Sequence, residues 1–168
     1  MIRSSCLLLA VAISAPCLKA ADGDSIDSVV RSVYDVISGP PGPRNWDRFR
    51  SLFAEGARMI PMRKTSAGGM APVVLTPEQF IERVSANAAK EGFFEHEIGR
   101  RVDSFGDIAH VFSAYESRRA PEEKPFTRGI NSFQLVRSGG SWRVVTILWD
   151  SEREGNAIPD RYLKPSGD

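Results

Sequence analysis

Four consecutive stretches that alternate apolar and polar residues constrain the fold more than any other feature of this chain. They cover residues 93–105, 108–118, 125–137 and 141–150. Alternation with a period of two is typical of β-strands that bury one face, and short turns with glycine separate the first pair and the last pair. The pattern therefore predicts a four-stranded antiparallel meander whose apolar face is covered by other elements.

The lengths of the turns predict which residues face each other. A two-residue turn in the first hairpin puts Ile98 opposite Tyr115, and a three-residue turn in the last hairpin puts Asn131 opposite Ile147. The face predicted to be apolar consists of Ile98, Val111, Tyr115, Phe133, Leu135, Val145, Ile147 and Trp149. This prediction depends on the register, because a slip of one residue exchanges the two faces.

The preceding segment supplies elements that can cover this face. Helical spacing of apolar residues and capping signals predict helices over residues 26–37, 46–53 and 77–88. Between the second and third of these, residues 57–62 and 72–75 have the composition of a short strand pair. This order of elements predicts an α+β fold with the helices gathered on one face of the sheet.

The first twenty residues have the pattern of a signal peptide. Arg3 supplies the positive charge, residues 7–13 form an apolar run too short to span a bilayer, and small residues precede Ala21. We expect cleavage near Ala21 and a periplasmic or secreted protein with no membrane anchor after processing. Both cysteines lie in residues 1–20, so we expect a mature chain without disulfides.

Residues 21–168 have the length of one domain, with a short irregular tail expected from about residue 151. Residues 1–20 contain two of the 22 Lys+Arg residues and none of the 21 Asp+Glu residues, which leaves 20 basic against 21 acidic side chains. A nearly neutral balance predicts no nucleic-acid partner. With two histidines and no cysteine in this part, no metal-ligand spacing is present, and we predict neither a metal nor a cofactor.

Three passages resemble the nuclear transport factor 2-like superfamily, which includes the SnoaL-like and ketosteroid-isomerase-like proteins. They are VRSVYDVI, WDRFRSLFAEGARMIP and SWRVVTILWD. The resemblance implies a cone-shaped curved sheet with helices on its concave face and a cavity between them. It also implies a place for a catalytic carboxylate in the strand at residues 57–62, where this chain has none and presents Arg58 and Met59.

Projected onto that fold, the predicted faces suggest a small-molecule site. We expect the ligand-binding residues to be Tyr34, His96, Tyr115, Asn131 and Trp149. A mostly apolar lining with a few donors and acceptors is typical of such a site. His96 could act as an acid or base near neutral pH, and Tyr115 or Asn131 could polarise a carbonyl oxygen.

The opposite face carries a second cluster, formed by Glu116, Arg128 and Asp150. It has two readings: a solvated salt-bridge ladder, or an anion clamp with an acid/base pair, which a register slip would turn into the pocket.

Two functions from different classes remain open. The first is an exported protein that binds a small, partly apolar ligand without changing it. The alternative is a SnoaL-type or ketosteroid-isomerase-type enzyme that moves a proton in the same cavity. We also expect a homodimer through the other sheet face, where Phe112, Ile130 and Leu148 stand among charged residues.

Overall fold

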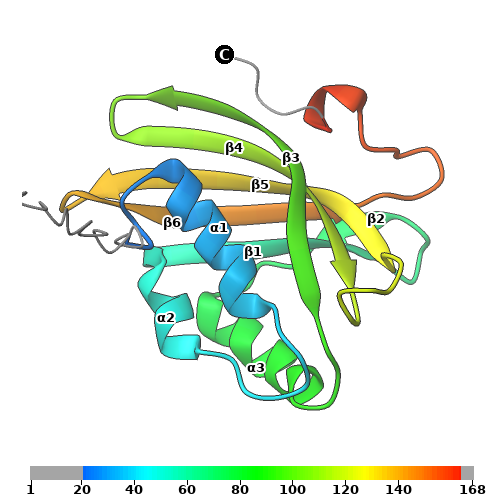
Figure 1. Ribbon diagram of the computed structural model, residues 1–168. Helices are drawn as coiled ribbons and strands as arrows, with labels where there is room; N and C mark the ends of the chain where they lie inside the picture. Colours follow the sequence, from blue (N-terminus) through cyan, green and yellow to red (C-terminus); the bar gives the residue numbers. More distant parts are fainter. Residues whose placement is uncertain (1–20, 164–168) are drawn as a thin grey trace, which may run out of the picture.

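A computed structural model describes residues 21–163 and shows a curved, open six-stranded sheet with three α-helices on its concave side (Figure 1). The helices are α1 (Ile26–Ile37), α2 (Trp46–Ser51) and α3 (Pro77–Ala88). The strands are β1 (Phe53–Lys64), β2 (Met70–Pro72), β3 (Phe94–Phe105), β4 (Ile108–Arg118), β5 (Thr127–Ser138) and β6 (Ser141–Ser151). A 3-10 turn, η1 (Asp160–Tyr162), follows. The predicted signal peptide and both cysteines lie outside the described residues.

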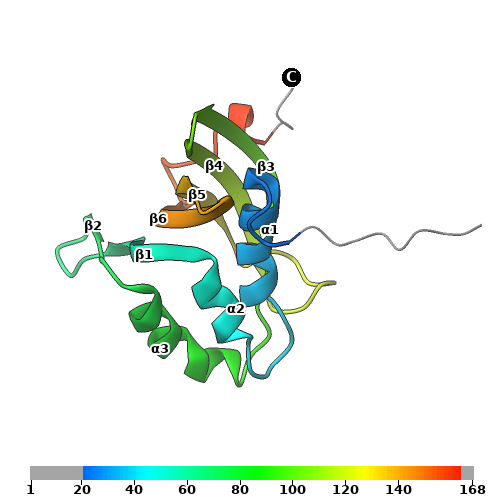
Figure 2. The same ribbon diagram turned by 90° about the vertical axis from the view of Figure 1, so that its left-hand side faces the viewer.

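The strands lie in the order β2-β1-β6-β5-β4-β3. Strands β3 to β6 form the predicted antiparallel meander, whereas β1 runs parallel to β6 and joins the helical half to the meander. Figure 2 shows how the sheet curves around α1, with α2 and α3 beneath β1. The predicted α+β fold with helices on the concave face is confirmed.

Local signals place the helix ends. Helices α1 and α3 each begin with a capping box. The hydroxyl of the N-cap residue accepts from the backbone N–H of the third helical residue, and the side chain of that third residue accepts from the backbone N–H of the N-cap residue. Helix α2 ends at Ser51, two residues earlier than expected, because Phe53 pairs with Val144 and starts β1. A hydrogen bond from Val144 N to Leu52 O, 2.9 Å long, fixes this change of direction.

The end of α1 is tied to the start of β3. Gly39 and Phe93 exchange two backbone hydrogen bonds, of 2.7 and 3.0 Å. Arg44 stabilises the same turn, because its guanidinium donates to several carbonyl oxygens, including those of Ile37 at 3.0 Å and Gly39 at 2.8 Å. The first residues of β3 are thereby held against α1.

The first hairpin contains a bulge that the sequence did not predict. From Phe105 back to Gly99 the pairing with β4 is as expected, but the register shifts between Gly99 and Glu97. Glu97, and not Ile98, therefore lies opposite Tyr115. A one-residue shift exchanges the faces of everything beyond it, so the first residues of β3 point the opposite way from the prediction.

The last hairpin also differs from the prediction. Its turn has two residues, Gly139 and Gly140, both with positive φ (59° and 82°), which is one fewer than predicted and shifts the pairing by one residue. This single shift exchanges the faces at the start of β6, so Val144 lies in the core in place of Val145. A bulge between Leu135 and Gln134 adds a second residue of shift, so Asn131 lies opposite Trp149 and not Ile147, and the side chains beyond the bulge keep their predicted face.

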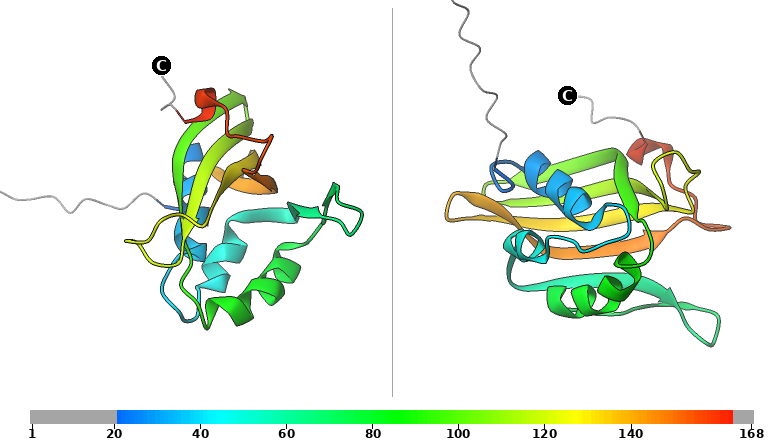
Figure 3. Two further views of the ribbon diagram at one scale, coloured as in Figure 1. Left: turned by 90° about the vertical axis from the view of Figure 1, so that its right-hand side faces the viewer. Right: turned by 60° about the horizontal axis from the view of Figure 1, so that its bottom comes forward.

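The residues after β6 cross the convex face of the sheet, on the side away from α1 (Figure 3). The ring of Tyr162 stacks on Phe112, with centroids 5.3 Å apart. Gly99 permits this approach, since a Cβ there would lie 2.2 Å from the carbonyl oxygen of Tyr162. No helix within residues 21–163 is long and apolar enough to cross a membrane.

Candidate functional site

A cavity of about 440 Å³ lies between the concave face of the sheet and the helices. Its walls are mainly aromatic and aliphatic, with contributions from Trp46, Phe49, Phe80, Phe133, Ile147 and Trp149. Neighbouring rings support one another: Phe80 stacks on Phe49 at 5.7 Å and meets Trp149 edge-on at 6.2 Å. Rings held in this way give the cavity a fixed apolar shape.

Glu95 is the ionisable group in the depth of this cavity. Burial raises the pKa of its carboxyl from 4.5 to about 7, and two hydrogen bonds oppose that rise. Ser117 Oγ donates to Oε2 at 2.7 Å, and Asn131 Nδ2 donates to Oε1 at 3.3 Å. Desolvation therefore outweighs the donors, and the group exchanges its proton near neutral pH.

The backbone holds Glu95 in this position from both sides. The bulge at Ile98 turns the side chain to the concave face, opposite Ser117 of β4. On the helix side, Ser38 Oγ accepts from the Glu95 N–H at 3.0 Å and lies 3.1 Å from the Glu95 carbonyl oxygen. The carboxyl is thus placed by the junction of α1 and β3, a rigid part of the fold.

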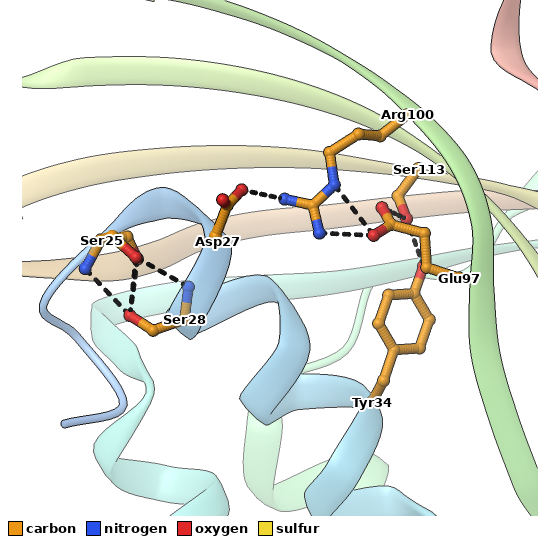
Figure 4. Close-up of polar contacts among 7 residues, drawn as sticks. All are labelled: Ser25, Asp27, Ser28, Tyr34, Glu97, Arg100 and Ser113. Carbon is orange, nitrogen blue, oxygen red and sulfur yellow. Dashed lines mark hydrogen bonds and ion pairs between the residues drawn. The ribbon is translucent and has the colours of Figure 1, made fainter. Parts of the chain in front are cut away.

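Asn131 connects Glu95 to a buried tyrosine. Its Nδ2 also donates to Tyr34 Oη at 3.1 Å, and Tyr34 Oη lies 2.6 Å from Ser113 Oγ. Burial and the nearby charge of Glu95 raise the pKa of Tyr34 well above 10, so its hydroxyl stays protonated. Ser113 continues the chain to Glu97, as Figure 4 shows.

Tyr115 is a second proton donor beside the cavity. Its hydroxyl lies 3.4 Å from Ser151 Oγ, and burial raises its pKa to about 12. Gly129 makes room for this ring, because a Cβ there would lie 2.7 Å from the Tyr115 hydroxyl oxygen. A neutral phenol in an apolar wall can donate a hydrogen bond to a ligand oxygen.

The mouth of the cavity is polar. Arg119 lies over the Phe126 ring, with its guanidinium carbon 4.5 Å from the centroid, and pairs with Glu91 at 3.1 Å. Arg63 borders the opening on the β1 side. A ligand therefore passes charged groups before it reaches the apolar interior.

Four of the five predicted ligand-binding residues come together. Tyr115, Asn131 and Trp149 line the cavity, and Tyr34 accepts a hydrogen bond from Asn131. The predicted face of His96 was wrong. The bulge in β3 turns it to the convex face, where its half-exposed ring lies 3.0 Å from Glu116.

The structure does not bring the alternative cluster together as one site. Arg128 pairs with Glu152 at 3.1 Å, and Asp150 pairs with Arg153 at 2.6 Å. Glu116 contacts the His96 ring and forms an ion pair with Arg118. These are separate pairs on the convex face, which agrees with the salt-bridge reading. No group of three potential metal-binding side chains occurs within residues 21–163.

Glu95 was missed because the sequence analysis assumed an unbroken strand. Gly99 was the available signal, since an isolated glycine inside a strand pattern often marks a bulge or a close backbone approach. Both occur here: the register shifts beside Gly99, and the C-terminal segment packs on it.

Solved structures share this arrangement of sheet and helices. A protein of unknown function from Mycobacterium tuberculosis superposes with a TM-score of 0.61 at 14% identity, over 80% of this chain and 75% of that one. An NTF2-like protein from Pseudomonas putida gives 0.59 at 12% identity, over 80% and 92%. An NTF-2-like protein from Silicibacter pomeroyi gives 0.52 at 18% identity, over 76% and 92%.

This chain has the NTF2-like fold. At these identities the likeness concerns the fold alone, and both NTF2-like neighbours are described as proteins of unknown function. No protein-family model and no curated protein matches the sequence. The function must therefore be argued from the cavity of this NTF2-like chain.

Proposed function

We propose that the protein binds a small, mostly apolar carbonyl compound in the cavity and that Glu95 moves a proton on it. The observation that carries this proposal is the carboxyl of Glu95, buried in an apolar cavity with a pKa of about 7. A group with that pKa is present in both protonation states at neutral pH, as a catalyst that takes and returns a proton must be.

The chemistry follows from two groups that line the cavity, the Glu95 carboxyl and the Tyr115 hydroxyl. The Glu95 carboxylate takes a proton from the carbon next to the carbonyl group, and the electron pair of that C–H bond moves to the carbonyl oxygen. The hydroxyl of Tyr115, whose pKa is about 12, supports the charge on that oxygen as a hydrogen-bond donor. Return of the proton to the same or another carbon yields an exchanged or isomerised product.

Binding without chemistry is the second candidate, and the aromatic walls favour it because they suit any apolar ligand. The pattern of residues 1–20 supports an exported setting for either function.

Deuterium exchange separates the two candidates. Cyclic enones and aryl ketones are incubated with the protein in heavy water, and NMR follows loss of the proton next to the carbonyl. Binding is measured by quenching of tryptophan fluorescence, since Trp46 and Trp149 line the cavity.

We expect exchange above the buffer rate with the wild type, and binding without exchange with Glu95→Gln. Binding by the wild type without exchange would support the binding protein, and no binding of any compound would contradict both candidates.

A further inference from the structure

A chain of hydrogen bonds leads from Glu95 to the surface beside α1. Asn131 donates to both Glu95 and Tyr34, Tyr34 meets Ser113, and Ser113 donates to Glu97 Oε1 at 2.5 Å. Ser113 is fully buried and Asn131 is 7% exposed. The chain therefore passes through the protein interior, and the hydroxyl and amide N–H donors of Asn131, Tyr34 and Ser113 each have an acceptor there.

The surface end of the chain is an ion pair. Arg100 donates through Nε to Glu97 Oε2 at 2.8 Å, and its Nη1 reaches Asp27 Oδ1 at 2.6 Å (Figure 4). A carboxylate paired with a guanidinium has no proton to give, so it can only accept from Ser113.

This end fixes the direction of every hydrogen bond behind it. Ser113 has one proton, which goes to Glu97, so its oxygen must accept from Tyr34. Tyr34 has then used its own proton and can only accept from Asn131. The amide of Asn131 must therefore present Nδ2, and not Oδ1, toward Tyr34 and toward Glu95.

The chain does not conduct protons. A side-chain amide donates and accepts hydrogen bonds, but it does not readily take up one proton and release another. Asn131 is such an amide between Glu95 and Tyr34. The chain therefore fixes the orientation of each side chain along it and does not carry a proton.

We propose that Glu97 is a positioning residue, which acts through Ser113 and Tyr34 to hold the amide of Asn131 with its donor toward Glu95. The ionised form of Glu95 then has a donor that the flipped amide would not supply. The consequence for catalysis rests on the proposed function, whereas the effect on proton binding by Glu95 does not.

Other charged and titratable groups face this chain of hydrogen bonds, and their charges also affect the pH midpoint of Glu95. Tyr34 and Asp27 face it from α1, Arg100 from β3 and Tyr115 from β4, while β5 contributes the neutral Asn131. Arg63, Glu91 and Arg119 stand at the cavity mouth. None of these groups is altered in the variants below.

Three variants of the full chain test the proposal without any ligand. Glu97→Leu removes the terminal acceptor, and Ser113→Ala breaks the chain in its middle. Glu97→Gln is the matched control, because it removes the charge and keeps a carbonyl oxygen that accepts from Ser113. The measurement is the pH midpoint of the Glu95 side-chain carboxyl in carbon-13 NMR, with the resonance assigned by its loss in Glu95→Gln.

We expect the midpoint to rise by about one pH unit in Glu97→Leu and Ser113→Ala, because a flipped amide favours the protonated acid. In Glu97→Gln we expect it to stay at the wild-type value. Unchanged midpoints in folded Glu97→Leu would overturn the proposal, and so would equal shifts in Glu97→Leu and Glu97→Gln, which would indicate a pure charge effect. The side chain of Glu97 is 19% exposed, so Glu97→Leu tests the proposal even if Ser113→Ala does not fold.

Discussion

Glu95→Gln removes a carboxyl whose pKa differs between the folded and the unfolded chain. Unfolded, this group has a pKa of 4.5, and folded its pKa is about 7. Below pH 4.5 both states carry the proton, and the stability of the fold is unaffected by this group. Between pH 4.5 and pH 7 the unfolded chain has ionised while the folded chain still holds the proton, so stability falls as the pH rises, and the loss is complete once the folded chain has ionised above pH 7.

The size of this loss follows from the pKa difference. One pKa unit corresponds to about 1.4 kcal/mol, so the shift to about 7 amounts to roughly 3 kcal/mol between pH 4.5 and pH 8. Glutamine has nearly the same shape and does not ionise. The variant is therefore expected to gain about 3 kcal/mol relative to the wild type over this range.

Urea unfolding followed by tryptophan fluorescence, at half-unit steps from pH 4 to pH 8.5, measures this difference. Subtraction of the two profiles removes the contributions of all other titrating groups. Glu55→Gln is the matched control, since Glu55 is an exposed carboxyl on β1, and we expect its profile to run parallel to the wild type. Parallel profiles for Glu95→Gln and wild type would refute the reasoning, because a carboxyl that costs nothing to ionise is not desolvated.

Four further outcomes are expected. Replacing Trp149 by alanine removes a cavity wall and is expected to abolish ligand-induced quenching and to cost about 3 kcal/mol in urea unfolding; full ligand affinity would contradict the site. Gly99→Ala places a methyl group against Tyr162 and is expected to speed trypsin cleavage in the C-terminal segment, measured by mass spectrometry; an unchanged rate would show that the segment is not packed there. Light scattering at tens of micromolar is expected to give the mass of a dimer formed through the convex face, where Leu148 is 39% exposed, and a monomer mass would count against it. N-terminal sequencing of the protein purified from its own host is expected to begin near Ala21, and an intact Met1 would disprove a cleaved signal peptide.

The sequence predicted most of the fold because strand alternation and turn residues are local signals. The concave faces of β4 and β5, and of β6 from Ile147 onward, were assigned correctly even though the last hairpin was shifted, since the combined shift of two residues leaves parity unchanged there. Tyr115, Asn131 and Trp149 therefore came together as expected.

The position of Glu95 in the cavity could not be predicted from these local signals. A bulge depends on how β3 meets α1 on one side and the C-terminal segment on the other, and both are contacts between distant parts of the chain. One extra residue was enough to exchange His96 for Glu95 at the cavity. The histidine looked suited to acid/base chemistry by its ordinary pKa, whereas the glutamate becomes suited only through burial.

The most direct test of the account is the titration of Glu95 in the wild-type chain by carbon-13 NMR of its side-chain carboxyl. We predict a midpoint of about pH 7 for Glu95, and a resonance that is absent from Glu95→Gln. A midpoint near pH 4.5 would mean that the carboxyl is solvated, and the proposed role of Glu95 in proton transfer would be contradicted.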